Sequence, residues 1–560
     1  MMDAFLRTCP PLPLPQEMAA WDARAFELGL PGCMLMENAA RAALAVLRRY
    51  VPHLEGKHVW LFMGGGNNGG DAAALARHLH DARALPVVGH LKPLSSFRGA
   101  AAEHIRMARA VGVPFVNLAA TLRHGDAAPA ALSARLGRRL APDDTARRPH
   151  ICVDGLLGTG FHGNLRPDLH ALIAALNFLS PQSFLLSLDI PSGLDGADGL
   201  PCPLAVQAHA TATFAAAKPG LVLPHARPWT GRLHVCDIGM PRSIRENGPC
   251  SVRLLPPDAP ARFAAPMPQG YKNSYGHVAI IGGARGLSGA AHLAARAALR
   301  AGAGLVTALV PAPSAPAVKG GLAEIMTLAL PSPDAAAPWR SAWTEEAAAF
   351  LRRCDALAVG PGMGRGDDAL HFLKEILEEE NRPPAVFDAD ALMLLAREPH
   401  LLSRLTSRDI LTPHPGEAAA LLGWTTREIQ AQRRRALAAL AAQSAAAVVL
   451  KGAGSLAAQG DSPQLLCPVD VPQLSVGGSG DVLAGCAAAL LARTRAPEGS
   501  ALAALGAALR LHAAAGRQCA TRFPCRGNGA TELAEALPAA WEAAPSDDTL
   551  LFDQDTACFI

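Results

Sequence analysis

The 560-residue chain lacks the sequence features that mark several large classes of protein. It has 12 cysteines but no C-x-x-C pair, so neither a disulfide framework nor a structural zinc site is expected, and a reducing cytoplasm fits best. No stretch of about 18 residues is apolar and free of charge and proline, which argues against a membrane-spanning helix. The N-terminus, MMDAFLRTCPPLPLP, lacks a basic start followed by an apolar segment, so no signal peptide is expected.

Charge is scarce and nearly balanced. Only 18% of the residues are charged, and the net charge is +3. No basic tract stands out beyond pairs and triplets such as RRR at 433–435, so neither a nucleic-acid nor a membrane-surface partner is indicated. Half of the residues are hydrophobic, which is typical of a soluble globular protein with a large interior, and the length predicts two to four domains.

Short apolar runs alternate with helix-like segments along the whole chain. In the first half the strand-like runs include 58–64, 86–91, 150–160 and 183–195; in the second half they include 277–283, 305–311, 356–364, 385–392, 409–417 and 445–454. Such alternation predicts parallel sheets with helices on both faces. A segment rich in proline and polar residues separates the halves. We therefore expect an α/β protein with two doubly wound, three-layer domains, residues 1–245 and 276–560, joined by a linker at 246–275.

The run WLFMGGGNNGGD at 60–71 ends a predicted strand in a glycine-rich turn. Gly64, Gly66 and Gly69 fit G-x-G-x-x-G, and glycines before a helix N-terminus favour a phosphate or nucleotide over a simple tight turn. An ordinary NAD-binding loop also needs an acidic residue about 20 residues further on. Here the next strand ends with His90 and Lys92, so a plain dehydrogenase is not favoured.

Two further loops, VDGLLGTGFHGN at 153–164 and LDIPSGLDGADG at 188–199, follow apolar strands. Asp154 and Asp189 each close a strand and are expected side by side at one edge of the sheet. Asn68, Asp154 and Ser192 offer only oxygen ligands, which suit Na⁺, K⁺ or Mg²⁺ rather than zinc. The alternative is that these side chains only cap helices, and spacing does not decide between the two.

The motif VGGSGDVLAG at 476–485 leads from a glycine-rich turn into a helix. Asp481 either complements the helix dipole or is a base beside an anion hole for a nucleotide phosphate. The loops 360–364, 387–392, 412–417 and 451–455 are each explained by a turn, but together they are expected to converge on one cleft. No Ser-His-Asp order, H-E-x-x-H helix or G-x-x-x-x-G-K-[ST] loop is present.

Taken together, these motifs resemble one family. LMENAARAAL (35–44), NNGGD (67–71), DGLLGTG (154–160), DIPSGLD (189–195) and FAAAKPGL (214–221) resemble the NAD(P)H-hydrate epimerase domain. GHVAIIGG (276–283), AVGPGMG (358–364), DADAL (388–392), TPHPGE (412–417), VLKGAG (449–454) and GGSGDVLAG (477–485) resemble ADP- or ATP-dependent NAD(P)H-hydrate dehydratases. Their order is similar to that of the bifunctional repair enzymes, over about 35–245 and 270–540.

The resemblance implies a Rossmann-like first domain and a ribokinase-like second domain that repair the hydrated cofactors NADHX and NADPHX. The first would interconvert the R and S forms at C6. The second would dehydrate the S form, with ADP or ATP phosphorylating the C6 hydroxyl and phosphate then leaving. The resemblance also implies K⁺ in the first domain, Mg²⁺ in the second, a cytoplasmic location and a homo-oligomer. The competing hypotheses are a ribokinase-like small-molecule kinase with a regulatory nucleotide-binding first domain, and a non-catalytic sensor.

The resemblance also implies roles for individual residues. Those expected to hold the hydrate in the first domain are Asn67, Asn68, Gly69, Gly70, Asp71, Gly158, Thr159, Gly160, Phe161, His162, Gly163, Asn164 and Asp189, with Asp189 as acid/base and Asn68, Asp154 and Ser192 binding K⁺. In the second domain, ADP is expected at Lys451, Gly452, Ala453, Gly454, Ser455 and Gly480, and the hydrate at Ala290, Gly364, His414 and Asp481, with Asp481 as base. Ala72 and Met393 stand where the family usually has Gly and Asn.

Overall fold

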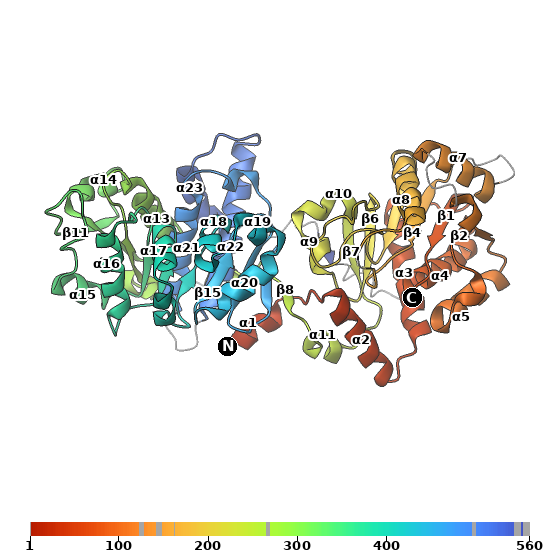
Figure 1. The fold of residues 1–560 in the computed structure, drawn as a ribbon, viewed down its shortest axis with the longest axis horizontal. Coiled ribbons are helices and arrows are strands. Elements are labelled where there is room, and N and C mark those ends of the chain that lie inside the picture. Colours follow the sequence, from red (N-terminus) through yellow and green to blue (C-terminus); the bar gives the residue numbers. More distant parts are fainter. Residues whose placement is uncertain are drawn as a thin grey trace. The chain divides into compact units, whose positions relative to one another are not determined.

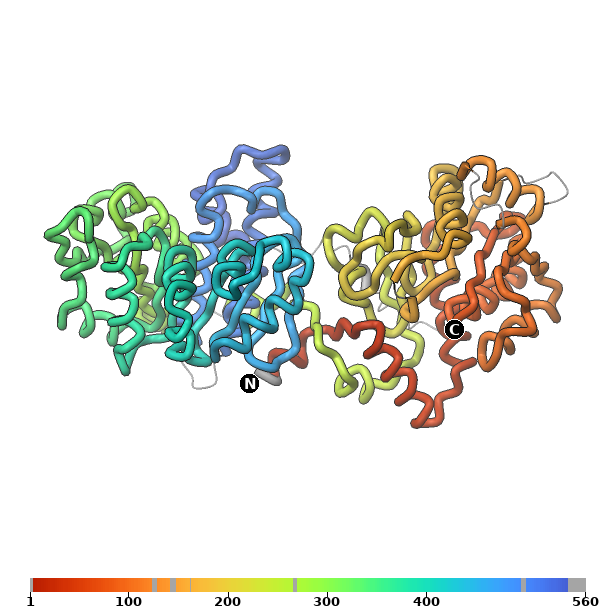
Figure 2. The backbone as a smooth tube through the Cα atoms, viewed as in Figure 1, coloured from red at the N-terminus to blue at the C-terminus, as the bar shows by residue number. Residues whose placement is uncertain are grey.

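The computed structural model describes residues 2–122, 128–141, 148–161, 163–264, 269–494, 500–541 and 550–552. The chain forms two compact units, which Figures 1 and 2 show coloured along the sequence. The first unit comprises Pro11–Val252 with Asp547–Ile560, and the second comprises Met1–Pro10 with Arg253–Ser546. The grouping of the first ten residues with the second unit is a feature that the sequence pattern did not predict.

The first unit is built on an eight-stranded sheet with the order β18-β7-β6-β5-β4-β1-β2-β3. Its strands are β1 (His58–Met63), β2 (Leu85–His90), β3 (Phe115–Asn117), β4 (Ile151–Gly155), β5 (Phe184–Leu188), β6 (Ala210–Phe214), β7 (Arg232–Cys236) and β18 (Leu550–Phe552), and their pairings are parallel. Its helices are α2 (Pro15–Glu27), α3 (Gly32–Tyr50), α4 (Asn67–Asp81), α5 (Gly99–Ala110), α6 (Ala119–Leu122), α7 (Pro129–Leu140), α8 (Pro167–Leu179), α9 (Pro219–Val222), α10 (Arg227–Thr230) and α11 (Arg242–Asn247).

Both faces of this sheet are covered by helices. Successive side chains of a strand point to opposite faces. Val59 and Leu61 of β1 belong to a hydrophobic cluster that includes α3, α4 and α5, whereas Trp60 and Phe62 belong to a second cluster that includes α7 and α8. The near-continuous apolar run of β1 therefore reflects burial on both sides, as parallel sheets require.

The second unit contains a ten-stranded sheet with the order β11-β10-β9-β12-β13-β14-β15-β16-β17-β8. Its strands are β8 (Val252–Leu254), β9 (His277–Ile281), β10 (Leu305–Pro311), β11 (Met326–Leu330), β12 (Ala356–Val359), β13 (Ala385–Phe387), β14 (Ile410–Leu411), β15 (Ala447–Leu450), β16 (Ser455–Gln459) and β17 (Gln464–Cys467). Its helices are α1 (Met2–Thr8), α12 (Ala261–Ala264), α13 (Ser288–Arg300), α14 (Ala315–Lys319), α15 (Glu345–Leu351), α16 (Asp367–Glu378), α17 (Asp390–Arg397), α18 (Pro415–Leu422), α19 (Thr426–Ala431), α20 (Arg433–Ala442), α21 (Ser479–Ala492), α22 (Ala501–Arg522) and α23 (Ala530–Ala540).

Strands β9 to β15 pair in parallel, whereas β16 and β17 are antiparallel. Val278 and Ile280 of β9 pack into a cluster with α13, α21, α22 and α23, while Ala279 and Ile281, on the opposite face, are also fully buried. The prediction of two doubly wound α/β domains is therefore confirmed. Phe5 of α1 belongs to the same cluster, which explains why the first residues are part of this unit.

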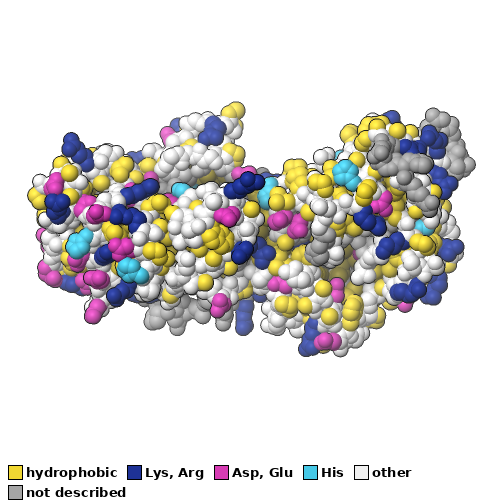
Figure 3. All heavy atoms as spheres, in the orientation of Figure 1, with side chains coloured by type: hydrophobic (Ala, Val, Ile, Leu, Met, Phe, Trp, Pro, Cys, Tyr) yellow, Lys and Arg dark blue, Asp and Glu magenta, His cyan; other side chains and the backbone are white. Residues whose placement is uncertain are grey.

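The surface agrees with the balanced composition. On the face shown in Figure 3, Lys and Arg side chains are interspersed with Asp and Glu on both units. Among the helices that the structure describes, none is long and apolar enough to cross a membrane.

Each sheet has one point at which the strand order reverses. In the first, the chain proceeds from β1 to β2 and β3 and then returns to β4 on the other side of β1; in the second, β9 and β12 are related in the same way. Ligands of open α/β sheets bind outside the carboxyl ends of the strands at such a point. The loops after β1 and β4, and after β9 and β12, are therefore where the two sites are expected.

Candidate active sites

The loops after β1 and β4 touch each other at the first reversal point. The amide of Gly64 donates to the carbonyl of Gly155 at 2.9 Å, and a Cβ added at Gly64 would lie 1.7 Å from the carbonyl oxygen of Leu156. Only glycine allows this approach. The paired loops open onto a cavity of about 1090 Å³ that helices α2 and α3 also line. This volume is large enough for a nucleotide-sized ligand.

Most of the predicted hydrate-binding residues face the cavity, but not all of them do. Those that line the cavity are Asn67, Asn68, Asp71, Gly158, Thr159, Gly160, Phe161, Asn164 and Asp189. Gly69 and Gly70 instead lie where α4 packs against its neighbours, because a Cβ at Gly70 would meet Met36 and Ala101. Ala72 is fully buried, with its methyl group facing Gly155. Gly163 is outside the lining, and His162 lies outside the described residues.

A buried ion pair lies at the floor of this cavity. Asp189 follows β5 with φ of +61°, a conformation that costs a non-glycine residue roughly 1–3 kcal/mol. Lys218 is 1% exposed, and its ammonium donates to Asp189 Oδ1 at 2.5 Å, to Thr213 Oγ1 at 2.9 Å and to the carbonyl of Phe214 at 3.1 Å. These three bonds use all three ammonium protons. Asp189 Oδ2 accepts a bond from the amide of Thr159 at 3.3 Å.

Two more carboxyl groups face the same cavity. Asp71, in the first turn of α4, is only 9% exposed, and no described residue donates a hydrogen bond to it. Burial, together with the charges of Asp189 and Asp22, raises the pKa of Asp71 well above its usual range. Burial also raises the pKa of Asp22, on α2, to about 6. The site therefore combines a carboxylate paired with lysine and two carboxyl groups whose pKa values are raised by burial.

Asp154 is placed differently from Asp189, although both close neighbouring strands. It is fully buried, and it accepts bonds from the Ser192 hydroxyl at 2.5 Å, the Ser192 amide at 2.8 Å and the Ser187 hydroxyl at 2.9 Å. Asn68 donates to the carbonyls of Leu157 and Leu188, but its Oδ1 is buried and without a hydrogen-bond partner. Such an orphaned oxygen is costly unless something binds it.

In the second unit, the loops after β9 and β12 meet in the same manner. A Cβ at Gly282 would lie 2.0 Å from the carbonyl oxygen of Pro361, and the amide of Ala284 donates to the carbonyl of Gly362 at 2.7 Å. Ala290 lies beside this contact, since a Cβ at Gly362 would be 3.2 Å from its methyl group. The predicted glycine loop after β12 and Ala290 are thus brought together.

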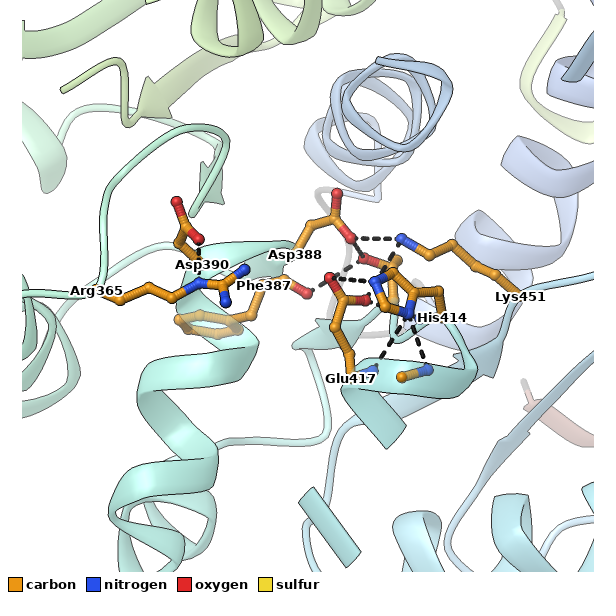
Figure 4. Close-up of polar contacts among 9 residues, drawn as sticks. Arg365, Phe387, Asp388, Asp390, His414, Glu417 and Lys451 are labelled. Carbon is orange, nitrogen blue, oxygen red and sulfur yellow. Dashed lines mark hydrogen bonds and ion pairs between the residues drawn. The ribbon is translucent and has the colours of Figure 1, made fainter. Parts of the chain in front are cut away.

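The loops after β13, β14 and β15 converge on the ammonium of Lys451 (Figure 4). Asp388 is 2% exposed and its Oδ1 accepts from Lys451 Nζ at 2.8 Å and from the Thr412 hydroxyl at 2.7 Å. A carboxylate oxygen of Glu417 lies 3.8 Å from the same ammonium. Although burial opposes ionisation, the charges of Asp388 and Glu417 raise the pKa of Lys451. A Cβ at Gly480 would be 3.4 Å from Lys451 Nζ, so the first turn of α21 reaches this cluster.

Two acidic groups of this cluster titrate near neutrality. Burial, with the charge of Asp388, raises the pKa of Asp481 to about 7, and burial raises that of Glu417 to about 7. His414 caps α18, because its Nδ1 accepts from the amides of Gly416 and Glu417. Burial and the nearby Lys451 lower the pKa of His414. Asp481 is thus a carboxyl group poised for proton transfer near pH 7.

The remaining predicted residues surround this cluster. The amide of Gly364 donates to Asp390 Oδ2 at 2.9 Å, and Arg365 pairs with the other oxygen of Asp390 at 2.7 Å (Figure 4). The predicted nucleotide loop continues from Lys451 through Gly452, Ala453, Gly454 and Ser455, whose hydroxyl donates back to the carbonyl of Gly452 at 2.8 Å. The guanidinium of Arg433 donates to the carbonyls of Leu450, Lys451 and Gly454 at 3.2–3.4 Å and so fixes the backbone of this loop.

Several residues of both sites were not predicted from the sequence. Lys218 carried a signal, because it is the only charge in FAAAKPGL and follows a strand-like run. Asp388, Asp390 and Glu417 stood inside quoted motifs without an assigned role. Asp22 and Arg433 gave no signal, since the first lies on a distant helix and the second in a basic triplet typical of a solvated surface. Among the described residues, no group of three or more His, Cys, Asp or Glu side chains is arranged to hold a metal ion.

Comparison with known proteins adds independent information. Residues 32–220 match the family described as YjeF-related protein N-terminus, and residues 278–539 match the family described as NAD(P)H-hydrate dehydratase. The chain is 36% identical to the bifunctional NAD(P)H-hydrate repair enzyme Nnr of Moorella thermoacetica, over 93% of this chain and 95% of the relative. It is 32% identical to the protein of the same name from Escherichia coli, over 91% and 90%. A crystal structure of the ADP/ATP-dependent NAD(P)H-hydrate dehydratase of Bacillus subtilis has 26% identity and a TM-score of 0.43, covering 52% of this chain and 97% of that one.

Proposed function

The chain belongs to the family of bifunctional NAD(P)H-hydrate repair enzymes, and from this membership we propose that its two units perform consecutive steps in the repair of hydrated nicotinamide cofactors. The first unit interconverts the R and S forms of NADHX and NADPHX at C6. The second dehydrates the S form with ADP or ATP as co-substrate. The observation that carries this proposal is that buried acid/base side chains gather beyond the carboxyl ends of the parallel strands in each unit.

In the first unit, the hydrate lies in the cavity beside the loops after β1 and β4. Epimerisation at C6 needs a group that accepts a proton and a group that donates one. Asp189 is the acid/base residue that we place against the reacting carbon, because it faces the cavity and its strained backbone and its bond to Lys218 fix its position. Asn67, Thr159 and Asn164 line the same cavity and supply polar contacts to the ligand.

A K⁺ ion fits the residues beneath this cavity. Asn68 presents a buried oxygen without a partner, and Asp154 supplies a fully buried carboxyl group. The Ser192 hydroxyl is hydrogen-bonded to Asp154, and Leu157 contacts both Ser192 and Asn68. Asn68, Asp154 and Ser192 thus form an oxygen-only donor set of the kind that hard cations prefer. K⁺ would fix the loops that hold the hydrate.

In the second unit, Asp481 removes the proton of the C6 hydroxyl, and the oxygen attacks the terminal phosphoryl group of the nucleotide. The bond from that phosphorus to the bridging oxygen breaks, and a phosphate ester forms at C6. Phosphate then leaves C6 with the electrons of the C6–O bond, and the neighbouring carbon loses a proton to water, which restores the double bond of the dihydropyridine ring. Lys451 and the amides at the start of α21 lie where they would stabilise the charge that develops on the phosphoryl group. Ala290, Gly364 and His414 border the place of the hydrate.

Mg²⁺ enters this scheme with the nucleotide. The described residues of the second unit do not form a metal site of their own. Mg²⁺ commonly binds through substrate phosphates with one or two carboxylates and keeps several waters, and this mode fits a cluster that contains the carboxyl groups of Asp388 and Glu417. We assign no step to the ion itself.

Separate incubation with R-NADHX and S-NADHX tests both units. S-NADHX with ADP should regain the absorbance of NADH with one ADP consumed per NADH formed, and R-NADHX should follow at a rate set by epimerisation. Nucleotide consumption only with an unrelated small alcohol would instead show a kinase. Binding of either hydrate without turnover would show a sensor.

A further inference from the structure

The first unit contains a second carboxyl group that the scheme above does not use. Asp71 faces the cavity from the first turn of α4, is about nine-tenths buried, and receives no hydrogen bond from any described residue. Asp189, which faces the same cavity, is held by Lys218 at 2.5 Å. The two carboxyl groups therefore differ in their surroundings. A lysine ammonium is bonded to Asp189 and stabilises its ionised form, whereas no cationic group among the described residues is bonded to Asp71.

We propose that Asp71 is the proton donor for epimerisation and that Asp189, paired with Lys218, is the proton acceptor. This inference rests on the proposed function of the first unit. It assigns to Asp71 a chemical role, beyond the binding role that the resemblance to the family implies.

The charges around Asp71 support this division. Asp22 of α2, Asp189 after β5 and Lys218 before α9 are the charged groups that act on it. Lys218 has all three of its protons committed to Asp189, Thr213 and the carbonyl of Phe214, so it cannot also donate to Asp71. A buried carboxylate without a donor, beside other carboxylates, is strongly disfavoured. Burial and these neighbours accordingly raise the pKa of Asp71, which keeps its proton available for transfer.

The chemical step follows from the two protonation states. Asp71 delivers its proton to the C6 hydroxyl oxygen, and the C6–O bond breaks with both electrons leaving on water. The positive charge is shared between C6 and the ring nitrogen N1. A water molecule then bonds to C6 from the other face, and its surplus proton passes to Asp189. In the reverse direction the two groups exchange roles, and proton exchange with solvent restores the starting state.

The test uses the full chain, whose second unit serves as an internal control. Asp71→Asn keeps the size of the side chain but removes its acid, so epimerisation of R-NADHX should fall by about 10²-fold or more. Dehydration of S-NADHX with ADP should remain at the wild-type rate, which shows that the second unit is intact, and an unchanged melting transition of the first unit shows that Asp71→Asn is folded there. The wild-type epimerisation rate should decline as the pH rises through the raised pKa of Asp71, because the protonated form is the active one. Asp71→Asn should lack this decline.

Asp22→Asn is the matched variant. It removes a neighbouring carboxyl group whose charge raises the pKa of Asp71, so the alkaline decline should persist but move to lower pH. In water labelled with ¹⁸O, each epimerisation should introduce one labelled oxygen at C6, measured by mass spectrometry against a blank without enzyme. An Asp71→Asn protein that keeps both its rate and its alkaline decline would overturn the role of Asp71, and an unlabelled product would overturn the C6–O cleavage. A wild-type protein that does not epimerise NADHX at all would instead overturn the proposed function.

Discussion

The pH dependence of dehydration gives the sharpest test of the second site. Asp481 is the proposed base, and it works only when ionised. Burial and the charge of Asp388 raise its pKa to about 7. About one tenth of the molecules then carry an ionised Asp481 at pH 6 and about nine tenths at pH 8. The rate of S-NADHX dehydration at saturating ADP should therefore rise roughly ninefold between these pH values and level off above them.

Two variants separate Asp481 from its neighbours. Asp481→Asn should lower the dehydration rate by about 10²- to 10⁴-fold and abolish the pH limb, while ADP still binds. Asp390 also raises the pKa of Asp481 through its charge, so Asp390→Asn should move the limb to lower pH without removing it.

The assay follows the absorbance of NADH, with R/S interconversion measured in parallel as the control for the intact first unit. A dehydration rate that does not change between pH 6 and pH 8 would refute the assignment. So would an Asp481→Asn protein that keeps a tenth or more of its activity.

Three further predictions concern residues that hold the loops and side chains of the two sites in place. Lys218→Met leaves a buried carboxylate without its partner, so urea denaturation should show the first unit destabilised by roughly 3 kcal/mol, and an unchanged midpoint would contradict this. Gly64→Ala places a Cβ 1.7 Å from the facing backbone and should lower the melting temperature and abolish epimerisation. Gly66→Ala is the control, because a Cβ added at Gly66 meets nothing within 4 Å, and it should melt like the wild type. Equal melting temperatures for the two variants would refute the packing argument. Arg433→Met removes the donors beneath the nucleotide loop and should raise KM for ADP about tenfold, whereas Arg435→Met, on the exposed side of α20, should not; equal KM values for both variants would contradict the role of Arg433.

The sequence predicted the architecture because its signals are local. Apolar runs such as 58–63 and 277–281 are buried on both faces. Burial on both faces requires a nearly continuous apolar sequence, which can be recognised in a single strand. The carboxyl ends of parallel strands share one edge of a sheet, so loops 64–71 and 154–160 could be placed together before any contact was known. The loops of the second unit could be grouped for the same reason, and the motifs in these loops identified the family.

The orientation of individual side chains was not predictable in this way. Asp154 and Asp189 close neighbouring strands and look equivalent in the sequence, yet Asp154 is enclosed by the amide of Ser192 and two hydroxyl groups, while Asp189 faces the cavity. The backbone conformation of Asp189, with φ of +61°, accompanies this difference. No local pattern specifies a left-handed aspartate, because surrounding contacts must hold it there.

The sequence by itself determined which loops form each site and which family the chain belongs to, because strand burial and motif spacing are properties of neighbouring residues. Only the tertiary structure decided which carboxyl groups have partners. Lys218 is 29 residues away from Asp189, and Asp22 reaches the same cavity from a helix in another part of the chain. Protonation depends on burial and on charges brought close by packing, so the division of Asp71 and Asp189 into acid and base exists only in the folded protein.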